Sequence, residues 1–203
     1  MQYPVLQQPV SFSEEIKKSR FICYLQPVSN LEEAKQFWQK VRAEHPDARH
    51  HCWATVAGAP NDSQQYGFSD DGEPSGTAGK PMLNVLLGSG LGEICAVVVR
   101  YYGGILLGTG GLVRAYGNGV QQALKLATTT IKIERQQYQL LCQYAQWAWL
   151  EAMLKHFDVE IVQQQFTDQV CLTLAIAEEQ AIQLNHQLNE RSAGQLQLQL
   201  IED

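Results

Sequence analysis

The chain has 203 residues, of which 45% are apolar and 18% are charged, proportions that are ordinary for a globular protein. Its net charge of −6 excludes the coating of nucleic acid through bulk charge. No apolar run approaches the ~20 residues that a membrane span needs. The N-terminus, MQYPVLQQPV, lacks the basic flank and apolar stretch of a secretory signal, so we expect a cytoplasmic protein with no membrane partner.

The charge is distributed unevenly along the chain. Residues 1–135 carry 13 Lys and Arg against 12 Asp and Glu, a balance of +1, whereas residues 136–203 carry 2 against 9, a balance of −7. Such asymmetry indicates two domains with different partners, which we place at 1–133 and 134–203. Any contact with RNA therefore requires a local basic patch on the first domain.

Apolar periodicity and turn residues predict the elements of the first domain, whose first strand is expected near residue 10. Asn30 is expected to cap one helix and Thr77 to cap another. The continuous apolar run EICAVVVRYY predicts a central strand that is covered on both faces. In chain order we expect a helix over 30–45, a strand over 50–57, a helix from 77 to 90, a strand over 93–102, a Gly-rich connection over 103–111 and a helix over 112–127.

The second domain has a different pattern of elements. Strands are predicted over 136–143, 159–166, 169–177 and from 194 onward, with helices over 145–157 and 178–190. The order βαββαβ within about 68 residues is that of the ferredoxin-like fold. We expect Ala181, Ile182, Leu184 and Leu188 to point into the core, and the Gln-rich strand positions to form a solvated sheet face. The whole chain is therefore of the α+β class.

The stretch FSDDGEPSGTAGKP, residues 68–81, raises the question of a phosphate-binding loop. A Walker loop has the pattern G-x-x-x-x-G-K-[ST]. Gly79 and Lys80 fit this pattern, but Pro74 stands where the first glycine belongs and Pro81 where the Ser or Thr belongs. A nucleotide-binding loop of this type is therefore not expected, and no other cofactor motif indicates a cofactor.

The same stretch contains an acidic loop of three carboxylates, Asp70, Asp71 and Glu73. Closely spaced carboxylates suit Mg²⁺, and they also suit a basic partner surface. The plainer interpretation is a solvated turn with its corner at Asp71-Gly72. We therefore assign no metal to the loop.

A glycine-rich connection, GGILLGTGG over 103–111, links the central strand to the next helix. Backbone N–H groups at a helix start bind anions well. Arg100 precedes the connection and Arg114 follows it, so an anion or RNA-phosphate site is one interpretation. The other is that the glycines allow close packing of the helix on the sheet.

A cluster of His45, His50, His51 and Cys52 invites a metal or acid–base interpretation. Because successive strand residues point to opposite faces, His50 and His51 are not expected to join one site. One of them is a candidate partner for Asp70 or Asp71 in an acid–base couple. The five cysteines form no CxxC pair, and we expect buried free thiols.

Several of these segments together resemble the IMPACT family. They are Arg49-His50, SDDGEPSGTAGKP, Met82-Leu83, Val97-Val98, RYYGG from Arg100 and GTGGLVRAY from Gly108, and the resemblance covers roughly residues 12–125. It implies that the first domain is the ribosomal-protein-like α/β domain of GHMP kinases, Lon proteases and the fourth domain of elongation factor G. The second domain is similar to the fifth domain of that factor.

The resemblance also implies a role near translation, because eukaryotic members of the family regulate translation through a protein partner. We do not expect this chain to bind that partner. The IMPACT family has no agreed catalytic residues, so the expected function is that of a non-enzymatic regulator. We expect it to bind ribosome, RNA or a translation factor, and we expect no sequence-specific DNA binding. Lys17, Lys18 and Arg20 would add to the basic patch. The candidate anion-binding residues are Arg49, His50, Lys80, Arg100, Gly103, Gly104, Gly108, Gly110, Gly111 and Arg114.

The alternative function is an enzyme that acts on a phosphorylated small molecule, with an anion site at 103–111. The acidic loop would then hold Mg²⁺ or supply a base. A concave pocket at the glycine-rich connection would favour the enzyme, and a flat basic face would favour the binding protein.

Overall fold

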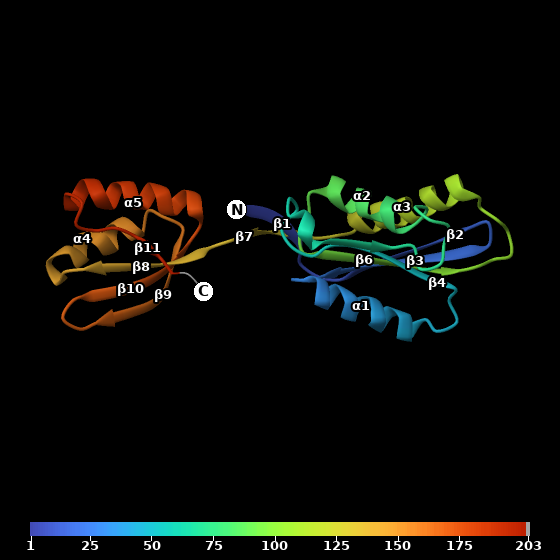
Figure 1. Ribbon diagram of the computed structural model, residues 1–203, viewed down its shortest axis with the longest axis horizontal. Helices are drawn as coiled ribbons and strands as arrows, with labels where there is room; N and C mark the ends of the chain where they lie inside the picture. Colours follow the sequence, from blue (N-terminus) through green and yellow to red (C-terminus); the bar gives the residue numbers. More distant parts are fainter. Residues whose placement is uncertain (202–203) are drawn as a thin grey trace. The chain divides into compact units, whose positions relative to one another are not determined.

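The computed structural model describes residues 1–201 and confirms the α+β class (Figure 1). The chain divides into two compact units. The larger unit comprises Tyr3–Lys132, and the smaller comprises Met1–Gln2 together with the chain from Ile133 onward. Within the described residues, no helix is both long enough and apolar enough to cross a membrane.

The larger unit is built on an antiparallel five-stranded sheet of order β2-β3-β6-β4-β5. The central strand β6 is buried from Ile94 to Arg100, because it has neighbouring strands on both sides and helices on both faces. This confirms the prediction made from its continuous apolar run. The strands are β2 (Val10–Ile16), β3 (Ser19–Pro27), β4 (His50–Val56), β5 (Tyr66–Ser69) and β6 (Ile94–Tyr101).

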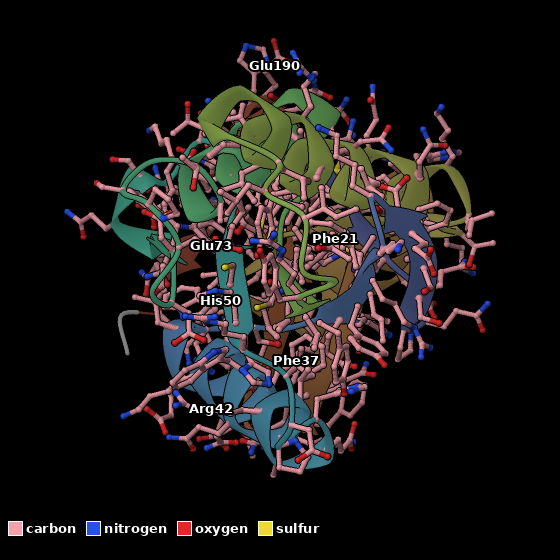
Figure 2. All side chains as sticks on the ribbon, turned by 90° about the vertical axis from the view of Figure 1, so that its right-hand side faces the viewer. Phe21, Phe37, Arg42, His50, Glu73 and Glu190 are labelled. Atoms are coloured by element: carbon pink, nitrogen blue, oxygen red, sulfur yellow. The ribbon has the colours of Figure 1, made fainter. Side chains whose placement is uncertain are left out.

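Helices α2 (Gly79–Ser89) and α3 (Thr109–Lys125) cover one face of this sheet, and α1 (Leu31–Glu44) covers the other. Alternate residues of β6 enter the two cores, with Ala96 and Val98 beneath α2 and α3. In Figure 2, Phe37 and Arg42 of α1 lie on the opposite side of the sheet from Glu73. Glu73 of the acidic loop is therefore on the side of α2 and α3, whereas Asp71 lies within 3.8 Å of Arg42 of α1.

Of the two predicted helix N-caps, Asn30 is confirmed and Thr77 is wrong. Asn30 caps α1 as predicted, since its side chain accepts the Glu33 N–H at 2.9 Å and the Glu33 carboxylate accepts the Ser29 N–H in return. Thr77 does not cap α2, because its hydroxyl donates to Pro74 O at 2.6 Å. The Asp70 carboxylate performs that role instead, accepting the Ala78 and Gly79 N–H groups at 3.0 and 2.8 Å.

Helix α3 begins three residues earlier than the predicted start at 112. Gly108, with a φ of 74°, is the cap residue, and the helix starts at Thr109. Gly110 and Gly111 therefore lie in the first helical turn and not in the connecting loop. Helix propensity alone hides this start, because glycine is a poor helix former.

A short ribbon near the N-terminus was not predicted. Strand β1 (Gln2–Leu6) pairs with β7 (Thr129–Ile133) in a two-stranded sheet, and the Gln7 N–H donates to Thr128 O. We expected the first strand near residue 10, which is where β2 begins. A single 3₁₀ turn, Ser63–Gln65, precedes β5.

The smaller unit has the predicted βαββαβ order and an antiparallel sheet of order β11-β8-β10-β9, as in the ferredoxin-like fold. Helices α4 and α5 bury Leu150 and Leu184 against β8 and β10. Strand β11 is much shorter than the strand predicted from Gly194. The elements are β8 (Gln136–Cys142), α4 (Tyr144–Leu154), β9 (Val159–Phe166), β10 (Val170–Ile176), α5 (Glu178–Ser192) and β11 (Gln199–Leu200).

Candidate functional site

The two motif segments of the larger unit meet at one cleft of about 400 Å³. The acidic loop forms one wall, and the connection between β6 and α3 forms the other. The cleft is concave, and a concave pocket at the glycine-rich connection favours an enzyme over a flat binding surface. Its lining comprises Arg49, His50, Gly72, Glu73, Pro74, Arg100, Tyr102, Leu106, Leu107, Gly108, Thr109 and Leu112.

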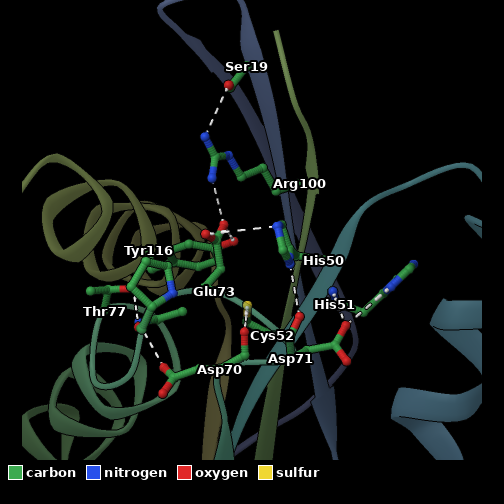
Figure 3. Close-up of polar contacts among 12 residues, drawn as sticks. Ser19, His50, His51, Cys52, Asp70, Asp71, Glu73, Thr77, Arg100 and Tyr116 are labelled. Carbon is green, nitrogen blue, oxygen red and sulfur yellow. Dashed lines mark hydrogen bonds and ion pairs between the residues drawn. The ribbon is translucent and has the colours of Figure 1, made fainter. Parts of the chain in front are cut away.

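A buried ion pair lies in the wall of this cleft. Glu73 and Arg100 are 8% and 5% exposed, and Arg100 Nη1 donates to Glu73 Oε1 at 2.7 Å (Figure 3). The Tyr116 hydroxyl donates to the same oxygen at 2.7 Å. Burial, followed by the neighbouring Cys52 and Glu73, raises the pKa of Tyr116 far above its usual value, so this hydroxyl keeps its proton. Arg100 is thus held in place from the inside of the fold.

His50 lines the cleft, and both of its ring nitrogens have a partner in the acidic loop. Its Nδ1 lies 2.8 Å from Asp71 O, and because a carbonyl only accepts, Nδ1 carries the proton. The other nitrogen, Nε2, lies 3.9 Å from Glu73 Oε2. The neighbouring His51 is buried and donates from Nε2 to His45 O at 2.9 Å, and its Nδ1 lies 3.6 Å from Asp71 Oδ2. Both histidines therefore contact Asp71, His50 at its backbone carbonyl and His51 at its carboxylate.

The three carboxylates of the acidic loop turn toward different partners. Asp70 caps α2 and also accepts the Gly76 N–H at 2.8 Å. Asp71 accepts the His51 N–H at 2.7 Å, and Glu73 accepts from Arg100. Within residues 1–201, no group of three His, Cys, Asp or Glu side chains is arranged to hold a metal ion. The loop is thus a structural element whose polarity is satisfied internally.

The predicted basic residues separate into three groups. Arg49 is exposed and Arg100 buried in the first cleft. Arg114 lines a second cleft of about 540 Å³, which also contains Lys17 of the β2–β3 turn. Lys80 lines neither cleft and lies over the Phe68 ring, 5.6 Å from its centroid. The two clefts flank the first turn of α3 and share Leu107 as a wall.

The glycine-rich connection is partly explained by packing. A Cβ on Gly103 would lie 2.0 Å from Lys18 O, and the Gly103 N–H donates to the Ser19 hydroxyl at 3.2 Å. This glycine therefore lets the connection pass against the β2–β3 turn. Gly104 and Gly108 have positive φ values, 83° and 74°.

The sequence reasoning missed two residues of the site, Ser19 and Tyr116. Ser19 is buried and lies 3.5 Å from Arg100 Nη2. The apolar stripe of α3 gave a usable signal for Tyr116, since it places this residue in the core with Leu112 and Val120. A buried tyrosine hydroxyl requires a hydrogen-bond partner. The carboxylate of Glu73, in the acidic loop, is the partner that Tyr116 has in the structure.

Comparison with known proteins agrees with the resemblance. The sequence profile described as the Impact N-terminal domain matches residues 17–124, and a second, described as a domain of unknown function (DUF1949), matches residues 140–195. An IMPACT family member from Haemophilus influenzae is 59% identical over 201 residues, 99% of this chain and 98% of that protein. The IMPACT family member YigZ from Escherichia coli is 57% identical over 195 residues, 96% of each chain.

The solved structures that this chain is similar to include one that matches along its whole length. It is described as the crystal structure of a hypothetical protein, is 55% identical, and covers 100% of this chain and 98% of its own with a TM-score of 0.71. This match supports the same fold in both units. With the Impact profile over more than half of the chain and relatives of nearly equal length, the chain belongs to the IMPACT family.

Proposed function

We propose that the larger unit is a non-enzymatic RNA-binding module of the translation apparatus. The observation that carries this proposal is the cleft at the start of α3, where Arg49 and the helix N-terminus lie together. The Leu112 N–H donates to Gly108 O, so the N–H groups of Thr109, Gly110 and Gly111 have no acceptor within the helix. Such groups, with the positive end of the helix dipole, favour a phosphate.

The basic side chains near the start of α3 support an anionic ligand. Arg49 is exposed in the first cleft, and Lys17 and Arg114 are exposed in the second. Arg100 takes a different part from the one expected from sequence. Because Nη1 donates to Glu73 and Nη2 to Ser19, Arg100 positions the cleft wall, and these two nitrogens are not surface contacts for phosphate.

Membership of the IMPACT family supports a role associated with translation. The family profile covers every residue that lines the two clefts except Ile16, and the proposal places the RNA contact there. The acidic second unit, with its balance of −7 over residues 136–203, suits a basic ribosomal protein surface. The chain would thus contact the ribosome with two surfaces of opposite charge.

The first experiment is sedimentation of a lysate through a sucrose gradient at low and high salt. The native chain is expected to migrate with ribosomal particles at low salt and to leave them at high salt. The variant Arg49→Ala with Arg114→Ala should stay at the top of the gradient. The matched control is Lys35→Ala with Lys40→Ala, which removes two exposed charges from α1 on the opposite face of the sheet.

A titration with single-stranded ribosomal RNA then counts the phosphate contacts. Each contact with a single strand contributes about −0.7 to the slope of log K against log salt. For contacts from Lys17, Arg49 and Arg114 the slope is about −2, and the double variant should lower its magnitude by about 1.4. Binding that does not depend on salt, or an equal loss in the α1 control, would overturn the proposal.

The concave cleft also favours a second candidate, an enzyme that acts on a phosphorylated small molecule. The specific observation is His50, which lines the cleft with Nδ1 fixed by Asp71 O and Nε2 3.9 Å from Glu73 Oε2. A base in this position suits proton abstraction. An enzyme of this kind requires free carboxylates to bind Mg²⁺ or act as a base. Asp70, Asp71 and Glu73 are instead bonded to α2, His51 and Arg100, which favours the binding module. Phosphate release from p-nitrophenyl phosphate that is lost in His50→Asn would support the enzyme.

A further inference from the structure

We infer that the start of α3 is a site for single-stranded RNA, with one backbone phosphate over the first helical turn and the flanking nucleotides in the two clefts. This inference rests on the proposed function and specifies its ligand. It follows from three features: the two clefts, a glycine that packing does not explain, and an unsatisfied arginine donor.

The two clefts lie on either side of one turn of helix. Gly108 and Thr109 line the first cleft, and Gly111 lines the second. Gly110 lies between them and is exposed. A chain that runs from one cleft to the other at this end of the helix passes the free N–H groups of the first turn. Each cleft also has an exposed cation, Arg49 in the first and Arg114 in the second.

Gly110 and Gly88 are the two helical glycines of the described residues that packing does not require, and Gly110 is the one at a helix start. It has no positive φ, and a Cβ added there would meet no atom within 4 Å. Glycine inside a helix is unfavourable relative to alanine, so a structural reason is expected where it occurs. At the start of a helix, glycine also lets a ligand approach the free backbone N–H groups closely. An exposed first turn without side chains provides this approach to a phosphate.

Arg100 supplies an independent indication of a ligand. It lines the first cleft and is 5% exposed, and its Nε–H has no acceptor among the described residues. Buried polar groups in native proteins are almost always hydrogen-bonded. A ligand oxygen that enters the cleft beside Tyr102 would give this donor an acceptor. The orphaned donor thus points to an oxygen-rich ligand at the same end of α3.

The lining of the first cleft favours a single strand over a duplex. Leu106 is 81% exposed and Tyr102 is 41% exposed, and both line the cleft. Exposed aromatic and apolar side chains bind unstacked bases, which a duplex keeps inside its stack. A duplex also presents a convex backbone that does not enter paired concave clefts. A flexible strand places a base in each cleft and its phosphate on the intervening turn.

The test is a fluorescence anisotropy titration of the full chain with a labelled uridine hexanucleotide and with a blunt RNA duplex of twelve base pairs. We expect the hexanucleotide to bind at least about tenfold more tightly at equal salt. Gly110→Gln places a side chain over the first turn and should weaken hexanucleotide binding by about tenfold or more. Gly88→Gln is the matched control, because Gly88 is also exposed and helical with open space at its Cβ.

The outcomes separate this inference from the proposed function. If the duplex binds as tightly as the hexanucleotide, or if Gly110→Gln binds the hexanucleotide like the native chain, the single-strand site is wrong while RNA binding stands. If neither RNA binds, the proposed function fails as well. Thermal unfolding of both glycine variants shows whether the fold is intact, and a binding loss shared by Gly88→Gln would also overturn the inference.

Discussion

Arg100 Nη1 and Glu73 Oε1 lie 2.7 Å apart inside the larger unit, although 27 residues separate them in the chain. The pair joins the end of the central strand to the acidic loop, and the Tyr116 hydroxyl of α3 donates to the same carboxylate. A strand, a loop and a helix are therefore fixed to one another at the edge of the cleft. This explains how the loop keeps its shape without a regular element of its own.

Removing either member of this pair should destabilise the larger unit. Glu73→Gln leaves the buried Arg100 guanidinium without a charged partner, and Arg100→Ala leaves the carboxylate unpaired. Breaking a buried pair from one side costs about 3–5 kcal/mol. Urea unfolding followed by tryptophan fluorescence measures this change.

The control for the buried pair is Arg42→Ala. Arg42 Nη1 lies 3.8 Å from Asp71 Oδ1, and its side chain is more than half exposed. An exposed pair of this kind contributes at most about 1 kcal/mol. Equal losses of stability in Arg42→Ala and Glu73→Gln would contradict the structural role of the buried pair.

Asp70→Ala should destabilise α2 more than Thr77→Val does. Asp70 accepts three backbone N–H groups at the start of the helix, whereas the Thr77 hydroxyl makes one hydrogen bond to Pro74 O. Loss of a helix cap costs about 1–2 kcal/mol, and further buried N–H groups left without an acceptor add to this. Chemical denaturation of both variants decides the order, and the reverse order would restore Thr77 as the cap.

His45 should make stability depend on pH. Its ring bridges the hydroxyls of Tyr24 and Tyr101, each at 2.8 Å. Burial first, and then the neighbouring His51, lower the pKa of His45 below its usual 6.5. The unfolded chain therefore binds this proton at a higher pH than the folded chain does, so stability present above about pH 6.5 is lost as the pH falls toward the folded pKa.

The measurement compares urea midpoints at about pH 7.5 and about pH 5 for the native chain and for His45→Gln. Glutamine retains a donor and an acceptor for the two tyrosines but does not titrate. The native chain should lose more stability on acidification than the variant. An identical loss in both would assign the pH dependence to other groups.

Thiol chemistry should distinguish Cys171 from the other cysteines. Cys23, Cys52, Cys95 and Cys142 are buried, whereas Cys171 is partly exposed. Burial raises the pKa of Cys95 to about 12, so its thiol stays protonated and unreactive near pH 8. Iodoacetamide followed by mass spectrometry should show one modified thiol in the folded protein and five after unfolding. Cys171→Ser should abolish labelling of the folded protein, and labelling that persists would place a reactive thiol elsewhere.

Local patterns were enough for many elements because the information lies in neighbouring residues. The Asn30 cap, the central strand β6 and the βαββαβ order follow from capping chemistry, apolar runs and periodicity. The same reasoning failed for Ile182, which is 66% exposed although the helical pattern placed it inward. Ala181 and Leu184 already fill the buried stripe of α5, which leaves Ile182 on the outer side.

By itself, the sequence determined the family, the two kinds of fold and the segments from which a site would be built. Only the tertiary structure decided which charges are available, because burial and pairing depend on residues that are distant in the chain. Arg100, expected as a phosphate contact, is paired with Glu73, and Asp70 caps α2 instead of facing a ligand. The two clefts around α3 arise from β2, the acidic loop and the glycine-rich connection together, and no local pattern encodes that meeting.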